Sequence, residues 1–187
     1  MDESERNCAK LTAILGIDEF KPPSQFRLYD LLGPGTQGIG VFKAQDTATG
    51  KKYAAKVFQI RREFVGYAKK ANTVSDDSTV LAYVREFRAI KGFRHANIVR
   101  YYFLDVSVDK FLDNYQLRVF MERCTGDTLE RDMGKVYQTY KAGYKSADVH
   151  RHFLDLLSGL DCLHQRQIVH RDLRPENLIL PSPKKKP

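Results

Sequence analysis

The sequence predicts an α+β protein with two lobes, of which the first is a five-stranded antiparallel sheet with one helix and the second is an incomplete helical lobe. Short apolar or alternating runs, separated by glycine and polar turns, fill the chain from Phe26 to Glu122. After Glu122 the apolar residues recur at helical spacing instead. These two patterns divide the chain into a leader (1–25), a sheet lobe (26–121), a partial helical lobe (122–180) and a basic tail (181–187).

The elements of the first lobe follow from turn signals and periodicity. The predicted strands cover residues 26–32, 41–44, 52–58, 98–104 and 117–122. The polar segment 105–114 is expected to separate the last two strands. Between the third and fourth strands, apolar side chains recur every three or four residues over 78–91, and Gly92 can end the run. This spacing predicts an amphipathic helix.

The second lobe contains the most regular helical pattern of the chain. Apolar residues at 153, 156, 157, 160 and 163 predict a core helix over 148–164. Ahead of it, Tyr137, Tyr140 and Tyr144 are spaced three and four residues apart. Their spacing is compatible with a ligand or partner surface, but packing between helices is the favoured interpretation.

Length and composition limit the class of protein. A chain of 187 residues suits one domain or two small lobes. It has no long apolar run and no basic, apolar leader, so we expect a soluble protein of the cytoplasm or nucleus without a membrane partner. Its cysteines, Cys8, Cys124 and Cys162, are odd in number and lack CxxC spacing, which argues for reduced thiols.

The charge is unevenly distributed. Residues 21–110 carry 16 basic and 8 acidic side chains, and the whole chain has a net charge of +8. Such an excess usually forms a solvated face, although it also suits an anionic partner. A nucleic-acid-binding protein is the weakest alternative, because the sequence has no aromatic-basic RNA-binding motif.

A glycine-rich segment follows the first predicted strand. Gly33, Gly35 and Gly38 satisfy GxGxxG, which favours nucleotide binding no more than a simple turn. A strand follows rather than a helix or a Gly-Lys-Ser/Thr sequence, which excludes a Rossmann or Walker A loop. The segment is therefore expected to be a hairpin lid.

A lysine lies within the apolar third strand. Burying an ammonium group is costly unless it is paired, so Lys56 is expected to have an anionic partner. Glu86 lies beside the apolar stripe of the predicted helix. We therefore predict an ion pair between Lys56 and Glu86, which would direct the ammonium group at two phosphates.

The segment 168–180 carries the most specific motif. His170, Arg171 and Asp172, with Asn177 five residues after the aspartate, match His-Arg-Asp-Leu-x-x-x-x-Asn, and the segment resembles the catalytic loop of eukaryotic protein kinases. The glycine segment, strand lysine and helix glutamate precede it in that family's order. Residues 94–102 and 121–130 are similar to kinases of translation initiation factor 2α.

The resemblance implies a protein-kinase-like two-lobe fold and an ATP- and Mg²⁺-dependent serine/threonine kinase. It implies that Asp172, Arg174 and Asn177 are catalytic, with Asn177 as a magnesium ligand. It assigns ATP binding to Gly33, Gly35, Gly38, Val41, Ala54, Lys56, Glu86, Met121, Glu122 and Cys124, the last two at the hinge. The implied partners are a protein substrate, with initiation factor 2α as the candidate, and another kinase or a second copy bound through the N-lobe or the exposed C-lobe.

The sequence departs from the kinase pattern in several places. Gly40 is an additional residue before Val41, Arg174 replaces the usual lysine, and 61–72 resembles an insertion. No Asp-Phe-Gly follows Asn177, which predicts truncation after the catalytic loop and leaves the activity of the 187-residue chain open. The alternative is an inactive kinase-like module that binds nucleotide or regulates a full kinase.

Overall fold

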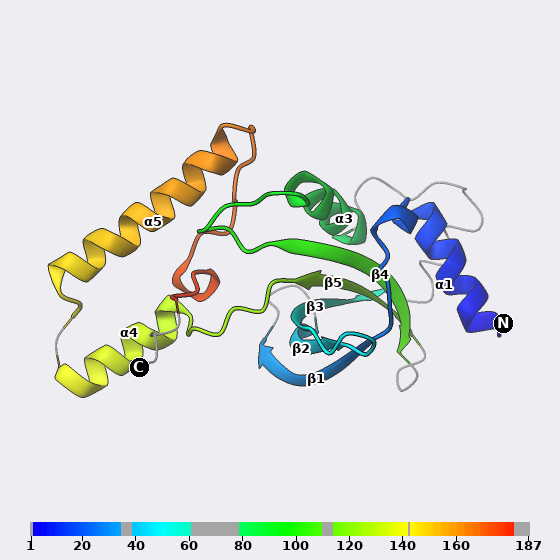
Figure 1. The fold of residues 1–187 in the computed structure, drawn as a ribbon, viewed down its shortest axis with the longest axis horizontal. Helices are drawn as coiled ribbons and strands as arrows, with labels where there is room; N and C mark the ends of the chain where they lie inside the picture. The colour runs from blue at the N-terminus through cyan, green and yellow to red at the C-terminus, as the bar shows by residue number, and fades with distance from the viewer. Residues whose placement is uncertain (1, 35–38, 61–78, 110–113, 142, 182–187) are drawn as a thin grey trace. The chain divides into compact units, whose positions relative to one another are not determined.

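The computed structural model describes residues 2–34, 39–60, 79–109, 114–141 and 143–181. The chain divides into two compact units (Figure 1). The first unit is Met1–Phe93 with Arg100–Arg123, and the second is Arg94–Val99 with Cys124–Pro187. Each unit is described by itself below. Within the described residues, no helix is both long and apolar enough to cross a membrane.

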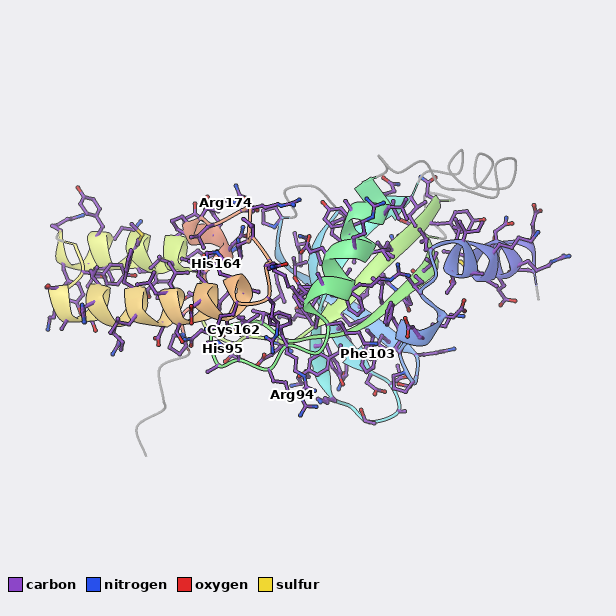
Figure 2. All side chains as sticks on the ribbon, turned by 90° about the horizontal axis from the view of Figure 1, so that it is seen from above. Arg94, His95, Phe103, Cys162, His164 and Arg174 are labelled. Carbon is purple, nitrogen blue, oxygen red and sulfur yellow. The ribbon has the colours of Figure 1, made fainter. Side chains whose placement is uncertain are left out.

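The first unit is built on the predicted five-stranded antiparallel sheet. Its strands are β1 (Phe26–Gly33), β2 (Gly40–Asp46), β3 (Lys52–Ile60), β4 (Tyr101–Asp109) and β5 (Asn114–Met121). They lie in the order β1-β2-β3-β5-β4, and every neighbouring pair is antiparallel. On one face, the rings of Phe26, Tyr53, Phe103 (Figure 2) and Phe120 pack into a small aromatic cluster.

The fourth strand differs from the prediction. It begins three residues later than expected and continues to Asp109, into the segment 105–114 that was predicted to separate it from β5. Residues 110–113 of that segment lie outside the described residues. The reason for the extension is a cross-strand ion pair, in which Arg118 of β5 binds both carboxylate oxygens of Asp105 at 2.6 and 2.7 Å. Because the two charges satisfy each other across the ladder, the strand tolerates them.

The predicted helix of the first lobe is confirmed as α3 (Thr79–Ile90). Val80, Tyr83, Val84 and Phe87 are buried, which is the i, i+3, i+4, i+7 pattern of one helical face. This face packs in the larger core cluster with side chains of β3, β4 and β5.

Residues 1–25, a leader without an assigned role in the sequence analysis, contribute to the same core. Helix α1 (Glu3–Ile14) begins with a capping box, in which Asp2 and Glu5 each accept the other's backbone N–H. A 3₁₀ turn, η1 (Asp18–Phe20), follows. Leu11, Leu15, Ile17 and Phe20 are buried in the larger core cluster. The sequence analysis missed this role because it took the acidic segment for a leader to the domain.

The second unit contains α4 (Leu129–Tyr140), α5 (Ser146–His164) and the 3₁₀ turn η2 (Pro175–Asn177). Helix α5 confirms the predicted helix. The Asn97 side chain donates a hydrogen bond to the Asp155 carbonyl at 2.8 Å, and a Cβ on Gly159 would lie 3.1 Å from the Asn97 carbonyl oxygen. Close contact at Gly159 therefore joins residues 94–99 to α5.

The tyrosines and the apolar stripe of this unit are more exposed than a packed core would be. Tyr137 and Tyr140 are 64% and 72% exposed on α4, so the favoured packing interpretation is wrong for them. Tyr144 lies beyond the helix and donates a hydrogen bond to Asp132. On α5, Leu163 is buried, whereas Phe153 is 59% exposed.

Candidate functional site

The register of the sheet brings the predicted ATP-binding residues of the first unit to one face. The β2–β3 pairing sets Val41 opposite Lys56, and the β3–β5 pairing sets Ala54 opposite Met121. Because alternate residues of a strand point to the same side, all four share a face, which is also the face of Phe58. Ala54 is buried and the other three predicted residues are partly buried. These residues form an apolar strip on the sheet, with the positively charged Lys56 at its end.

The ammonium group of Lys56 lies against two aromatic rings. Its Nζ is 5.2 Å from the ring centroid of Phe58 and 5.4 Å from that of Tyr83, and these two rings stack at 3.6 Å. A cation over aromatic faces is attracted by the ring electrons. Across the described parts of the chain, no ion pair joins Lys56 to Glu86, so the predicted pair is not formed here. The stacked rings supply the stabilisation that was expected from a carboxylate.

Glu86 is exposed on α3 and acts on two phenols instead. Burial raises the pKa of Tyr83, and the charge of Glu86 raises it further. The pKa of Tyr101 is raised in the same way, first by burial and then by Glu86. The carboxylate of Glu86 therefore lies close enough to β4 and to the Lys56-binding tyrosine to influence both.

The glycine-rich segment is described at its two ends. Gly33 closes β1 opposite Val41, whereas Gly35 and Gly38 lie outside the described residues. Gly40 begins β2 with φ +152°, and a Cβ there would lie 2.5 Å from the Leu31 side chain. The residue that the sequence analysis treated as an addition is thus a position that requires glycine.

The predicted hinge residues follow β5. The Glu122 N–H donates to the Arg100 carbonyl at 2.7 Å, and the Glu122 carboxylate accepts from the Arg100 N–H at 3.3 Å. This double contact fixes the backbone of Glu122 at the end of the sheet. Cys124 belongs to the second unit, where its side chain is partly exposed.

The three predicted catalytic residues meet in the second unit. The Asn177 side-chain amide donates to the backbone carbonyl and to the carboxylate of Asp172, each at 2.8 Å. The Nε of Arg174 (Figure 2) lies 3.3 Å from the other carboxylate oxygen of Asp172. This Nε is buried and has no hydrogen-bond partner in the described structure. Asp172 is therefore fixed on one side by an amide and faces a guanidinium on the other.

The backbone around Asp172 is tightly turned. Arg171 has φ +65°, a conformation that costs energy for a residue with a side chain. The Asp172 N–H donates to the His170 carbonyl at 2.9 Å. Strain of this kind persists where the surrounding contacts hold the segment. The Asp172 side chain is 58% exposed and so is accessible to a substrate.

The end of this segment is attached to the start of α4. The Leu129 N–H donates to the Leu178 carbonyl at 2.7 Å, and the Leu180 N–H donates to the Asp127 carbonyl at 2.9 Å. A Cβ on Gly126 would lie 1.7 Å from the Leu180 carbonyl oxygen, so only glycine fits. The sequence analysis missed Gly126, although its position just before the Thr128 N-cap of α4 was a usable turn signal.

In the described residues, no three His, Cys, Asp or Glu side chains gather in a way that could hold a metal ion. Asn177 uses its amide nitrogen for Asp172, which leaves its amide oxygen as a single neutral ligand atom. Mg²⁺ usually takes most of its oxygen ligands from water and from substrate phosphates, so Asn177 stays a predicted ligand.

The sequence was also compared with known proteins. The model of the protein kinase domain matches residues 26–186. Cell division control protein 2 homolog 1 of Trypanosoma brucei brucei is 31% identical over 158 residues, which are 84% of this chain and 44% of that protein. Cyclin-dependent kinase D-1 of Arabidopsis thaliana is 27% identical over 81% of this chain and 32% of its own length.

A third relative extends the pattern. Cyclin-dependent kinase G-2 of Oryza sativa subsp. indica is 29% identical over 83% of this chain and 19% of its own length. The chain thus spans less than half of the length of each of these relatives. Their names do not support the predicted likeness to initiation factor 2α kinases or that factor as a substrate.

The match to the kinase model begins at the first residue of β1 and extends beyond η2. It includes both the sheet face around Lys56 and the Asp172, Arg174 and Asn177 cluster. The chain therefore belongs to the protein kinase domain family.

Proposed function

We propose that the chain is a serine/threonine protein kinase domain that transfers the γ-phosphoryl group of ATP to a protein hydroxyl. The observation that carries the proposal is the position of Asp172, held by Asn177 at 2.8 Å and facing Arg174 at 3.3 Å. An exposed carboxylate beside a cation can accept a proton from a hydroxyl while the cation faces a phosphate. Positioning and electrostatic stabilisation account for most of the catalysis of phosphoryl transfer.

The first unit supplies the nucleotide-binding part of the proposal. Val41, Ala54 and Met121 present an apolar strip for the adenine, and Lys56 presents a positive charge for the phosphates. To reach a phosphate, the Lys56 ammonium would leave the rings of Phe58 and Tyr83. A charge-assisted hydrogen bond to phosphate is stronger than a cation–π contact at a partly exposed site, so this exchange is favourable.

The second unit supplies the transfer step. The substrate hydroxyl oxygen forms a bond to the γ-phosphorus, the bond from that phosphorus to the bridging oxygen breaks, and ADP leaves. The hydroxyl proton passes to the Asp172 carboxylate. Asn177 keeps that carboxylate in place, and the guanidinium of Arg174 offsets the negative charge of the phosphoryl group.

Kinases generally use Mg²⁺ to neutralise charge on the phosphates. In the described residues, no three His, Cys, Asp or Glu side chains gather to hold a metal ion, so no step of this mechanism is assigned to one. Magnesium is included in the assay below as the usual counterion of ATP.

A transfer assay tests the proposal. The full chain is incubated with γ-labelled ATP, magnesium and a mixture of acceptor proteins, and the labelled residues are identified after hydrolysis. We expect label on serine and threonine, abolished by Asp172→Ala and retained in the neighbouring exposed variant Glu176→Ala. Label that survives Asp172→Ala contradicts the assigned role.

A second function is favoured because Lys56 and Glu86 do not form an ion pair with each other in the described part of the chain. A kinase-like module that binds nucleotide without transferring phosphate would tolerate Lys56 on aromatic rings. Calorimetric titration with ATP separates the two functions. Binding without transfer supports the module, whereas transfer that depends on Asp172 excludes it; a chain with neither property contradicts both.

A further inference from the structure

The segment after α1 lies against the C-terminal half of α3. Arg88 Nη2 donates to the Leu15 carbonyl at 3.1 Å and to the Gly16 carbonyl at 2.6 Å. The rings of Phe20 and Phe87 meet edge to face at 5.3 Å, and Lys91 Nζ lies 3.9 Å from the Phe20 ring centroid. We call this contact the α1–α3 junction, formed by Leu15, Gly16, Phe20, Phe87, Arg88 and Lys91.

The junction is well packed and tolerates few side-chain changes. Leu15, Phe20 and Phe87 are 3%, 6% and 1% exposed and belong to one core cluster. Gly16 has φ +62°, and a Cβ there would lie 2.8 Å from Arg88 Nη2. The backbone therefore favours glycine at position 16, and a side chain there would displace the Arg88 guanidinium. In addition, a cation near the last carbonyls of α1 interacts favourably with the helix dipole.

The junction fixes the direction of Glu86. Successive side chains on a helix point roughly 100° apart. Because Phe87 is buried in the core and Arg88 is bound to Gly16, α3 cannot rotate freely about its axis, and the direction of the Glu86 side chain is therefore fixed. In that direction its charge acts on Tyr83, the tyrosine that holds Lys56. A movement of α3 at the junction would therefore change the surroundings of Lys56, and all of these residues lie in the first unit.

We propose that residues 3–20, in which α1 and η1 pack on β4 and residues 15–20 contact α3, form an intramolecular docking element, and that Arg88 is a positioning residue through which this element controls nucleotide binding at Lys56. The inference rests on the proposed nucleotide-binding function. The sequence places the element directly before the domain that matches the kinase family, whose match begins at residue 26. Residues that lie outside the matched region would thus influence the position of α3, which lies inside it.

The first test uses the full chain and three variants. Arg88→Ala removes both bonds to the α1 end, Arg88→Lys keeps the charge without the planar fork, and Arg27→Ala removes an exposed charge on β1 as the matched control. ATP affinity is measured by calorimetry, and amide hydrogen exchange is followed by mass spectrometry. We expect Arg88→Ala to weaken ATP binding at least about fivefold, Arg88→Lys to restore part of it, and Arg27→Ala to bind as the parent does.

Hydrogen exchange distinguishes release of the element from unfolding. In Arg88→Ala we expect faster exchange in α1 and α3 and unchanged exchange in β3 and β5. If Arg88→Ala does not fold, Gly16→Ala disturbs the same junction from the other side and is expected to have the same two effects. Faster exchange in α1 and α3 with parental ATP affinity would leave Arg88 a purely structural role and overturn the inference.

A double-mutant cycle tests whether the effect passes through Glu86. Glu86→Ala is expected to weaken ATP binding, and Arg88→Ala is expected to add little to it, because both changes remove the same constraint. Fully additive losses would overturn the positioning role. If neither the parent nor Arg27→Ala binds ATP, the proposed function and the control of nucleotide binding both fail, and the exchange rates then decide separately whether residues 3–20 hold α3.

Discussion

Asn177 holds Asp172 at two points, because its side-chain amide nitrogen lies 2.8 Å from both the backbone carbonyl and the carboxylate of that residue. Asn177 follows Asp172 by five positions in the chain, and η2 brings the two side chains together. The pair therefore behaves as one unit, in which the amide fixes the carboxylate and the carboxylate orients the amide. The contribution of this contact to phosphoryl transfer can be tested by changing either residue.

Asn177→Ala is predicted to reduce phosphoryl transfer by about a hundredfold, because the variant leaves the Asp172 carboxylate free to rotate away from the acceptor hydroxyl. ATP binding by the first unit should change little. The measurement is initial rate with γ-labelled ATP, alongside ATP affinity by calorimetry. Glu176→Ala, an exposed neighbour in η2, is the control and should retain the parental rate. An unchanged rate in Asn177→Ala would show that Asp172 does not depend on this amide.

Lys56→Met is predicted to weaken ATP binding by roughly tenfold, because it removes a charge-assisted bond to phosphate while it keeps most of the apolar stem. Unfolding by urea should change by less than about 1 kcal/mol, since the lost contact with Phe58 and Tyr83 is a cation–π interaction at a partly exposed site. Lys52→Met, at the exposed start of the same strand, should bind ATP as the parent does. Equal losses in the two variants would indicate a general charge effect.

Sequence reasoning predicted the sheet and the helices more reliably than the contacts between them. Helices α3 and α5 were found because their apolar residues recur at helical spacing, and the strand around Lys56 was found because it is almost continuously apolar. The extension of β4 through Asp105 was not predicted, because a charged residue argues against a strand unless its partner is known. The partner, Arg118, lies on the neighbouring strand and is identified only by the structure.

For the candidate site, motif spacing predicted the Asp172 and Asn177 cluster, because the two residues are close in the sequence. The expected Lys56–Glu86 pair depends on how α3 lies on the sheet, which is set by residues far apart in the chain. Phe58 stacks on Tyr83, and Lys56 lies against both rings instead of pairing with Glu86. Local spacing does not contain this information, and neither does it reveal the contact between Arg88 and Gly16.

Phe120→Ala is predicted to destabilise the first unit by about 3–5 kcal/mol, because the ring is fully buried and its removal leaves a cavity beside Phe26, 4.4 Å away between centroids. Urea unfolding followed by circular dichroism measures the loss. Leu31→Ala, at a side chain that is 54% exposed on β1, is the control and should cost less than about 1 kcal/mol. Similar losses for the two would mean that the aromatic cluster does not form in solution.

Arg118→Ala is predicted to destabilise the first unit by about 2 kcal/mol, because it leaves the Asp105 carboxylate, whose side chain is only 14% exposed, without its bidentate partner. The pair between Lys43 and Asp30 is the matched contrast, since its carboxylate is 76% exposed. Lys43→Ala should cost well under about 1 kcal/mol, as exposed ion pairs usually do. High salt should reduce the small destabilisation caused by Lys43→Ala and leave the destabilisation caused by Arg118→Ala largely unchanged.

Asp46→Asn is predicted to make the free energy of unfolding depend less steeply on pH in acid. The Ser24 hydroxyl, 2.5 Å from the Asp46 carboxylate, and the backbone N–H groups of Ala48 and Thr49 lower the pKa of Asp46 to about 2. Since the folded pKa lies below the ordinary value of 3.8, the contribution of this carboxylate is fully present above about pH 4 and is lost as the pH falls toward 2. Urea midpoints measured across this range should decrease more steeply for the parent than for Asp46→Asn, so the two curves should converge in acid. Parallel curves would show that the hydrogen bonds around Asp46 do not stabilise its charged form in the folded chain.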